Sequence, residues 1–277
     1  MLAPPLRALW VLLALGPAPA LAQDSAQVEL VFLDVGQGDA VLVRSPEGRT
    51  VLIDAGPRDI VPQLKALGLT TIDVVIASHP HADHIGGMQR VLRAFPVRYY
   101  MDDGATHTTQ TYENLMRRLE RSNVTYVEAT DRTINLGSVT LRILPPPATG
   151  DLNNRSVGVV VAFGEFRALL TGDSEQPELD HFLQLGVPDV TVLKAAHHGA
   201  DDGLTSDWLN ATKPEVVVIS AGANNGFGHP HPWALNLYQN AATVYTTAVH
   251  GTITILAARD GSFHVMTAEA RVPDNAR

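Results

Sequence analysis

The segment that most constrains this chain is His-Pro-His-Ala-Asp-His, residues 79–84, which directly follows the apolar run 74–76. Residues two apart in an extended segment point to the same side, so His79 and His81 can converge on one cation. Asp83 and His84 can begin the following helix and face a second cation. Four potential ligands at the end of a buried strand therefore predict a metal site. A polar loop of hydrogen-bonded histidines is the less favoured alternative.

The composition limits which groups can hold such a metal. The chain contains no cysteine, which leaves His, Asp and Glu as ligands and excludes disulfides and cysteine nucleophiles. Its 277 residues are 45% hydrophobic and 18% charged, which suits one globular domain or two small ones. The formal net charge of −9 argues weakly against nucleic acid, although a local positive strip can still attract a polyanion.

Residues 1–22 have the pattern of a secretion signal peptide. Arg7 precedes an apolar run at 8–15, and Ala20-Leu21-Ala22 is a small-x-small cleavage site. Glycine and proline interrupt the apolar run before it reaches the roughly 20 residues that a membrane span requires. We therefore expect cleavage after Ala22, a secreted or periplasmic product, and no stable membrane insertion after cleavage.

Short β-rich runs alternate with helical patterns along the rest of the chain. Strands are expected at 28–35, 40–44, 50–54, 73–78, 98–101, 139–144, 157–163, 167–171, 190–196 and 215–220, with helices that include 60–67, 111–121 and 178–185. Strands with interspersed helices imply a layered α/β fold. No stretch has the composition of a linker, so residues 23–277 are expected to form one domain.

Three further strands lead into potential ligands. These are Asp173 after 167–171, His197 and His198 after 190–196, and His229 and His231 in a Gly/Pro loop after 215–220. Successive strand ends share one edge of a sheet, where α/β folds place their sites. A carboxylate such as Asp173 can bridge two divalent ions. The alternative is that it caps a helix beginning near Ser174.

The remaining histidines lack ligand spacing and are expected to be solvated or hydrogen-bonded. They are His107 in a polar loop, His181 on a helix, and His250 and His264 in C-terminal strands. Six arginines offer a basic strip for nucleic acid: Arg90, Arg93, Arg98, Arg117, Arg118 and Arg121. We favour ordinary solvated positions for them, because Glu113 and Glu120 are available as partners.

The ordered motifs resemble the metallo-β-lactamase fold family. The segments LDVGQGDAVLV, VLIDAG, SHPHADHIGG, NNRSVGVVV, LLTGDSE, LKAAHHGA and ISAGANNGFGHPHP are similar, in order, to the C-terminal hydrolase domain of ComEC-type DNA-uptake proteins and its free-standing secreted relatives. The match runs from about residue 29 to residue 255. The resemblance implies an α/β (α+β) fold, a single-domain, four-layer αββα sandwich with a dinuclear metal site.

The resemblance also implies a role for each ligand. His79 and His81 would hold one metal, Asp83 and His84 the other, and Asp173 would bridge them. His197 and His229 would complete the two spheres, with His198 and His231 close enough to substitute or to line the pocket. Asp34, Asp39 and Asp54 are expected in turns or behind the ligands. Ligation by His and Asp alone suits two divalent ions, either Zn²⁺ or Mn²⁺.

The chain departs from the family pattern at several positions. Where β-lactamases supply a third histidine before the bridging Asp, it has Asn153-Asn154-Arg155-Ser156, which argues against a β-lactamase. Asn154 and Ser156, with His198 and His231, are expected to donate hydrogen bonds to the substrate. Ala200 stands where a serine is usual, and no polytopic membrane region is present, so a role in DNA transport does not follow.

These features together predict an exported metal-dependent hydrolase. A hydroxide activated by two cations would attack the substrate, with Asp83 and Asp173 as its catalytic carboxylates. A phosphodiesterase or nuclease is the first choice, with a phosphodiester substrate, DNA being the leading guess, and no partner protein. The alternatives are a carbonyl hydrolase of the lactonase, thioesterase or β-lactamase type, and a non-catalytic, metal-stabilised DNA-binding module.

Overall fold

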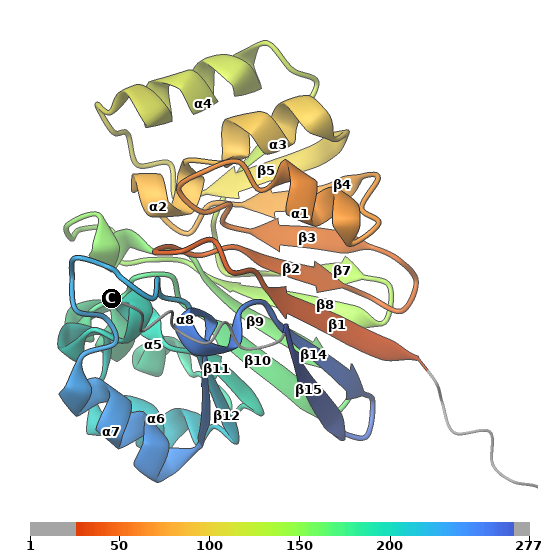
Figure 1. Cartoon of the computed structure of the whole chain (residues 1–277). Coiled ribbons are helices and arrows are strands. Elements are labelled where there is room, and N and C mark those ends of the chain that lie inside the picture. The colour runs from red at the N-terminus through yellow and green to blue at the C-terminus, as the bar shows by residue number, and fades with distance from the viewer. Residues whose placement is uncertain (1–25, 269–277) are drawn as a thin grey trace, which may run out of the picture.

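The computed structural model describes residues 26–268 and contains two stacked β-sheets (Figure 1). The strands of the first sheet are β1 (Gln27–Phe32), β2 (Val41–Arg44), β3 (Thr50–Ile53), β4 (Ile72–Ile76), β5 (Val97–Asp102), β6 (Thr125–Glu128), β14 (Ile253–Ala258) and β15 (Phe263–Thr267). They lie in the order β15-β14-β1-β2-β3-β4-β5-β6. The last two strands of the described chain therefore complete the sheet that the first strand begins.

The second sheet is built from the middle of the chain. Its strands are β7 (Arg132–Leu136), β8 (Val139–Leu144), β9 (Gly158–Phe163), β10 (Phe166–Leu170), β11 (Val192–Lys194), β12 (Val216–Ile219) and β13 (Thr243–Thr246). They lie in the order β13-β12-β11-β10-β9-β8-β7, with β10 to β13 parallel to one another.

Helices cover the outer faces of both sheets. Those of the first half are α1 (Val61–Ala66), α2 (Ala82–Ile85), α3 (Met88–Ala94) and α4 (Gln110–Glu120); those of the second half are α5 (Gln176–Leu185), α6 (Ser206–Thr212), α7 (Pro232–Ala241) and α8 (Thr247–His250). Three short 3-10 turns complete the structure: η1 (Asn153–Arg155), η2 (Ala196–Gly199) and η3 (Asp201–Gly203).

The buried apolar side chains form three clusters, because successive residues of a strand point to opposite faces of its sheet. In β1, Leu30 and Phe32 point between the two sheets, while Val31 points toward the helices of the first half. A third cluster, which includes Trp208 of α6, lies between the second sheet and its helices. Both sheets thus bury both faces, which gives the order helix, sheet, sheet, helix. The predicted four-layer, single-domain αββα sandwich is confirmed.

The element boundaries differ from expectation at a few places. The strand expected at 190–196 ends at Lys194, because the chain turns into η2, where His197 and His198 both have positive φ angles. His250, expected in a strand, ends the short helix α8. The predicted signal peptide, residues 1–22, lies outside the described residues. Within residues 26–268, every helix is too short or too polar to cross a membrane.

Candidate metal centre

The candidate centre lies where parallel strands of both sheets reach their carboxyl ends. β3, β4 and β5 are parallel neighbours in one sheet, and β10, β11 and β12 are parallel neighbours in the other. The segment 79–84 follows β4, Asp173 follows β10, and His198 follows β11. The two sheets therefore contribute side chains to one edge of the sandwich, as the strand ends predict.

One pair of ligand atoms comes from the extended part of this segment. Nε2 of His79 lies 3.0 Å from Nδ1 of His81, so the two imidazoles converge as their spacing predicts. His79 is buried, and burial together with the nearby His84 holds its pKa well below 6.5. A neutral histidine has a free ring nitrogen to offer a cation.

A second group combines residues from both sheets. One ligand atom each from Asp83, His84, Asp173 and His198 lies within 4.8 Å of the others. Nε2 of His84 is 3.1 Å from Oδ2 of Asp173, and Nε2 of His198 is 3.3 Å from the same oxygen. Nε2 of His198 is also 3.4 Å from Oδ2 of Asp83. Asp173 Oδ2 is thus at the centre of the group, as a bridging carboxylate would be.

The two imidazoles of this group are held from behind. Nδ1 of His84 donates to Oδ2 of Asp54 at 2.8 Å, and Nδ1 of His198 donates to the carbonyl oxygen of Ser220 at 2.8 Å. Each ring therefore directs Nε2 into the group. Both Nε2 atoms are buried and have no hydrogen-bond partner within the described residues. Imidazoles fixed through Nδ1, with a free Nε2, fit a divalent cation.

The electrostatics of the group also fit a cation. Burial raises the pKa of Asp173, but His198 and His84 outweigh burial and hold that pKa well below 3.8. Burial lowers the pKa of His84, yet Asp173 and Asp54 raise it well above 6.5. The buried carboxylates thus favour positive charge beside them, which a bound divalent ion would supply in place of the ring protons.

The helix-cap alternative for Asp173 is not what the structure shows. Glu175, not Asp173, occupies the position before the first residue of α5. The backbone amide of Asp173 donates to Oγ of Ser156 at 3.2 Å, which fixes the carboxylate at the strand end. Asp173 is therefore available to the centre.

Sequence reasoning missed Lys194, the last residue of β11. Its buried ammonium group contacts the carboxylate of Asp39, donates to the carbonyl oxygen of Gly172 at 2.9 Å, and lies 3.9 Å from Oδ1 of Asp173. Asp39 in turn lies 3.4 Å from Nδ1 of His198. The sequence did carry a sign of this contact, because Lys194 is a charged residue at the end of an apolar strand. A lysine is rarely buried without a partner of opposite charge.

His197 is placed differently from its neighbour. Its Nδ1 donates to Asp202 at 2.8 Å and lies 3.9 Å from Glu175, forming a separate group that is partly exposed. Of the two alternatives left open by the sequence, the structure brings His198 rather than His197 to Asp173. The difference follows from the positive φ angles of both residues, 46° and 55°, which turn consecutive side chains apart.

His229 and His231 lie on the loop after β12. The ring of His229 is 6.0 Å from that of His198, and its Nδ1 is 3.3 Å from the amide nitrogen of Gln37. The ring of His231 is 4.8 Å from that of His229, and its Nδ1 accepts from the backbone amide of Asp201. Both therefore border the centre without joining the group around Asp173.

Asn154 and Ser156, which we expected to contact the substrate, form hydrogen bonds within the protein. The side-chain amide of Asn154 donates to Asp151 and Glu175, and Ser156 Oγ donates to the carbonyl oxygen of Asn153. Both side chains are buried, and Ser156 lies behind His79, with 3.4 Å between Oγ and Nδ1. These residues brace the loop that supports the centre, because their polar groups are already engaged there.

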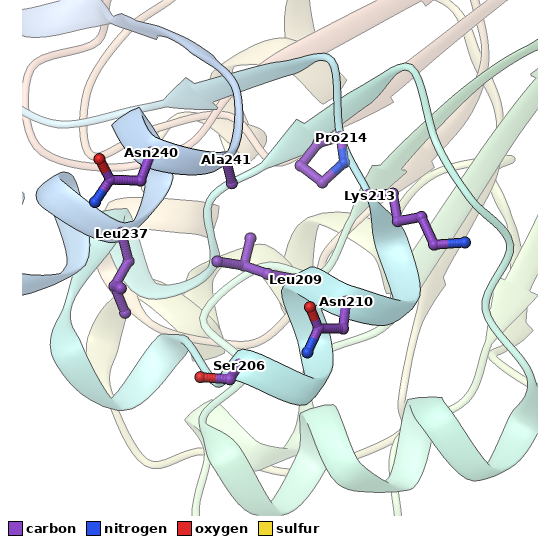
Figure 2. A pocket seen from close by; sticks show the side chains of 8 residues that line it. All are labelled: Ser206, Leu209, Asn210, Lys213, Pro214, Leu237, Asn240 and Ala241. Atoms are coloured by element: carbon purple, nitrogen blue, oxygen red, sulfur yellow. The ribbon is translucent and has the colours of Figure 1, made fainter.

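A separate cleft of about 440 Å³ lies between α6 and α7. Figure 2 shows Leu209 and Leu237 lining it from the two helices, with Lys213 and Pro214 beside them. Pro214 precedes β12, whereas the centre lies beyond the end of that strand. The cleft is therefore at the opposite edge of the sheet and takes no part in the centre.

Residues 33–223 match the sequence model of the metallo-beta-lactamase superfamily. The chain belongs to this superfamily. It is 27% identical over 257 residues to ComE operon protein 3 of Bacillus subtilis, a match that covers 83% of this chain and 33% of that protein. This similarity confirms the resemblance to ComEC-type proteins.

Two other likenesses extend this comparison. Endoribonuclease ysh-1 of Neurospora crassa is 28% identical over 208 residues, covering 63% of this chain and 24% of that protein. The chain therefore matches about a third or less of the length of these curated relatives. The structure of CmlA, a diiron beta-hydroxylase from Streptomyces venezuelae, superposes with a TM-score of 0.53 at 19% identity, covering 86% of this chain and 55% of CmlA. That likeness is one of fold.

Proposed function

We propose that the mature chain is an exported phosphodiesterase that depends on two divalent metal ions, zinc or manganese. The observation that carries this proposal is the pair of adjacent ligand groups that share Asp173. Oδ2 of Asp173 lies 3.8 Å from Nε2 of His79 in one group and 3.1 Å from Nε2 of His84 in the other.

Each of the two groups would hold one ion. His79 and His81 would bind the first, while Asp83, His84 and His198 would bind the second, with Asp173 shared between them. The ligand set is thus the predicted one with His198 in place of His197 and without His229. Two divalent cations lower the pKa of a bound water and stabilise charge at an attacked phosphorus centre and its leaving oxygen.

The side chains at the solvent side of the centre would orient the substrate. The side chain of Asp83 is 30% exposed, whereas those of His84 and Asp173 are at most 3% exposed, so the substrate would approach over Asp83. The ring of His229 lies 6.0 Å from that of His198. The amide of Gln37 can donate to Nδ1 of His229, which leaves the Nε2 proton free to donate to a phosphate oxygen.

A phosphodiester is favoured over a carbonyl substrate for three reasons. Two adjacent cations suit in-line displacement at phosphorus. In addition, one curated relative carries the name endoribonuclease. The absence of a third histidine near residue 154 also argues against the β-lactamase pattern.

Export is supported by the signal-like residues 1–22, and N-terminal sequencing of exported protein should begin at Gln23.

The test is an activity panel on the purified mature chain, reconstituted with zinc or with manganese. We expect about two ions per chain, and turnover of bis-p-nitrophenyl phosphate and single-stranded DNA that exceeds turnover of a lactone or a β-lactam. Asp83→Asn should abolish turnover, while Asp34→Asn, on a turn where Asp34 accepts from the Gly36 amide, should retain it. Hydrolysis of the lactone or β-lactam alone would replace this proposal with the carbonyl-hydrolase alternative. Salt-sensitive DNA binding without any turnover would replace it with the non-catalytic module.

A further inference from the structure

A second polar site lies away from the metal centre, in a cleft between α3 and α4. α4 lies over α3 on the outer side of the first sheet (Figure 1). The cleft has a volume of about 280 Å³ and is lined by Gln89, Arg93, Asn114, Arg117, Arg118 and Arg121. Four of its six lining residues are arginines and none carries a carboxylate. Such a concentration of positive charge stands out in a chain whose net charge is −9.

Hydrogen bonds between α3 and α4, and one within α4, fix the walls of this arginine cleft. Nε2 of Gln89 donates to the carbonyl oxygen of Asn114 at 3.1 Å, and Arg117 donates to the side chain of Asn114 at 2.7 Å. Arg118 donates to the carbonyl oxygen of Leu92 at 2.8 Å, in the last turn of α3. Its Nε is buried and has no hydrogen-bond partner within the described residues. The cleft is therefore preformed in the absence of a ligand.

Two of the arginines are free to bind an anion. Arg93 and Arg121 are exposed, and neither forms an ion pair with any carboxylate of residues 26–268. Arg117 pairs with Glu113 at 3.6 Å, but both side chains are about half exposed, so that pair is weak. Attraction to the carboxyl end of a helix explains the contact of Arg118 with Leu92. It does not explain why arginines from two helices face one cleft.

We propose that the arginine cleft binds backbone phosphates of a single-stranded nucleic acid that also reaches the metal centre. Guanidinium groups match the geometry of phosphate oxygens and keep their charge at every physiological pH. The inference deepens the proposed function and rests on it for the identity of the polymer. It identifies this basic cleft as the surface through which the chain, despite its net negative charge, binds the negatively charged nucleic acid.

The placement of α4 connects the cleft to the centre. The ring of His81 lies 6.2 Å from that of His107, which lies 6.5 Å from the ring of Tyr112 in the first turn of α4. From Tyr112 to Arg121, nine residues of helix rise about 13 Å. A single nucleotide cannot contact both places, whereas a strand of several nucleotides can. The cleft therefore favours a polymer over a small phosphodiester.

The first measurement is direct binding to the metal-loaded chain. The probe is a fluorescent oligothymidylate about 15 nucleotides long, with phosphorothioate linkages that keep the charge and resist cleavage. We expect Arg93→Gln/Arg121→Gln to weaken binding and to reduce the slope of log K against log salt by about 0.7 for each arginine. Arg93→Lys/Arg121→Lys should keep most of the slope, because it keeps the charges.

Arg90 provides the matched control. It lies on α3 but does not line the cleft, and it approaches Asp59 at 4.0 Å. Arg90→Gln should leave the salt slope unchanged. If Arg90→Gln lowers the slope by as much per charge removed as the double Gln variant does, the effect is one of overall charge and the cleft assignment is overturned. Loss of binding to phosphatidylglycerol vesicles, with oligonucleotide binding retained, would overturn it as well.

Kinetics separate this inference from the proposed function. With an unmodified oligonucleotide, the double Gln variant should raise KM and leave kcat near that of the unaltered chain, while turnover of bis-p-nitrophenyl phosphate stays the same. Suppose the chain hydrolyses phosphodiesters but the double Gln variant leaves both KM and the salt slope unchanged. The assignment of the cleft as a nucleic-acid site is then wrong, and the proposed function is retained. If no phosphodiester is hydrolysed but the salt slope falls as expected, the proposed function fails and the cleft stands as a nucleic-acid site.

Discussion

Nε2 of His198 lies 3.3 Å from Oδ2 of Asp173, while the imidazole of the preceding His197 bonds to Asp202. We therefore expect His198→Ala to lower the metal content of the chain toward one ion, because it removes a proposed ligand. His197→Ala should leave the metal content unchanged and serves as the control. Elemental analysis after reconstitution measures both. Equal metal content in the two variants would show that His198 is not a ligand.

The contact between Asp54 and His84 gives a second prediction. Asp54 accepts from Nδ1 of His84 and from the backbone amide and hydroxyl of Ser78, so it sets the orientation of the ring. Asp54→Asn should weaken metal binding about 10- to 100-fold, the usual cost of losing such a partner. Titration against a competing chelator measures the affinity. Unchanged affinity would mean that His84 needs no support from Asp54.

The buried pair of Lys194 and Asp39 gives a prediction about stability. Lys194→Met leaves the Asp39 carboxylate without its cation and should cost about 3–5 kcal/mol in the free energy of unfolding. The double change Asp39→Asn/Lys194→Met should recover much of that loss, because no unpaired buried charge remains. Denaturant unfolding at a fixed metal concentration measures all three. A double variant as unstable as Lys194→Met would contradict this account.

Glu178 on α5 gives a prediction about pH. Burial raises its pKa to about 9 from an ordinary value of 4.5, against the opposing effects of Ser174 and of the Ser156 amide. Between these two pH values the folded chain keeps a proton that the unfolded chain releases. Stability should therefore fall as the pH rises through this window, by up to about 1.4 kcal/mol per unit.

Glu178→Gln is the control for this pH effect, because it keeps the shape of the side chain and cannot ionise. Its free energy of unfolding, followed by denaturant titration from acid to alkaline pH, should fall less steeply than that of the unaltered chain. The difference between the two curves should grow as the pH rises. Parallel curves would mean that Glu178 ionises normally in the folded chain.

Strands with a strong apolar pattern were predictable, and three of the four edge strands in the described part of the chain were not. β8 was expected at 139–144 and spans Val139–Leu144, because its alternating side chains pack between the sheets. β6, β7 and β13 were not expected, and each lies at an edge of its sheet. Three of the four β6 side chains are exposed, so main-chain pairing forms this strand without a periodic apolar signal.

At the candidate centre, the types of the ligand residues were predictable from the sequence, but the directions in which some side chains point were not. The convergence of His79 and His81 follows from strand spacing, which is a local property. The choice between His197 and His198 depends on two positive φ angles, and the partners of Asn154 depend on Glu175, twenty-one residues away. Likewise, four of the six arginines expected to be solvated line one cleft, because α3 and α4 pack side by side.

The pairing of β14 with β1 affects the order in which the first sheet can form during synthesis. β14 pairs with β1 in a register that joins Gln27 to Ala258 and Phe32 to Ile253. The first strand therefore gains its second neighbour only after β14, which is far away in the sequence, has been synthesised. A ribosome-bound fragment lacking that neighbour leaves one side of β1 without backbone partners and its apolar residues uncovered. Such late closure leaves this sheet incomplete during synthesis, which is the state that the export proposed above would require for passage through a translocation pore.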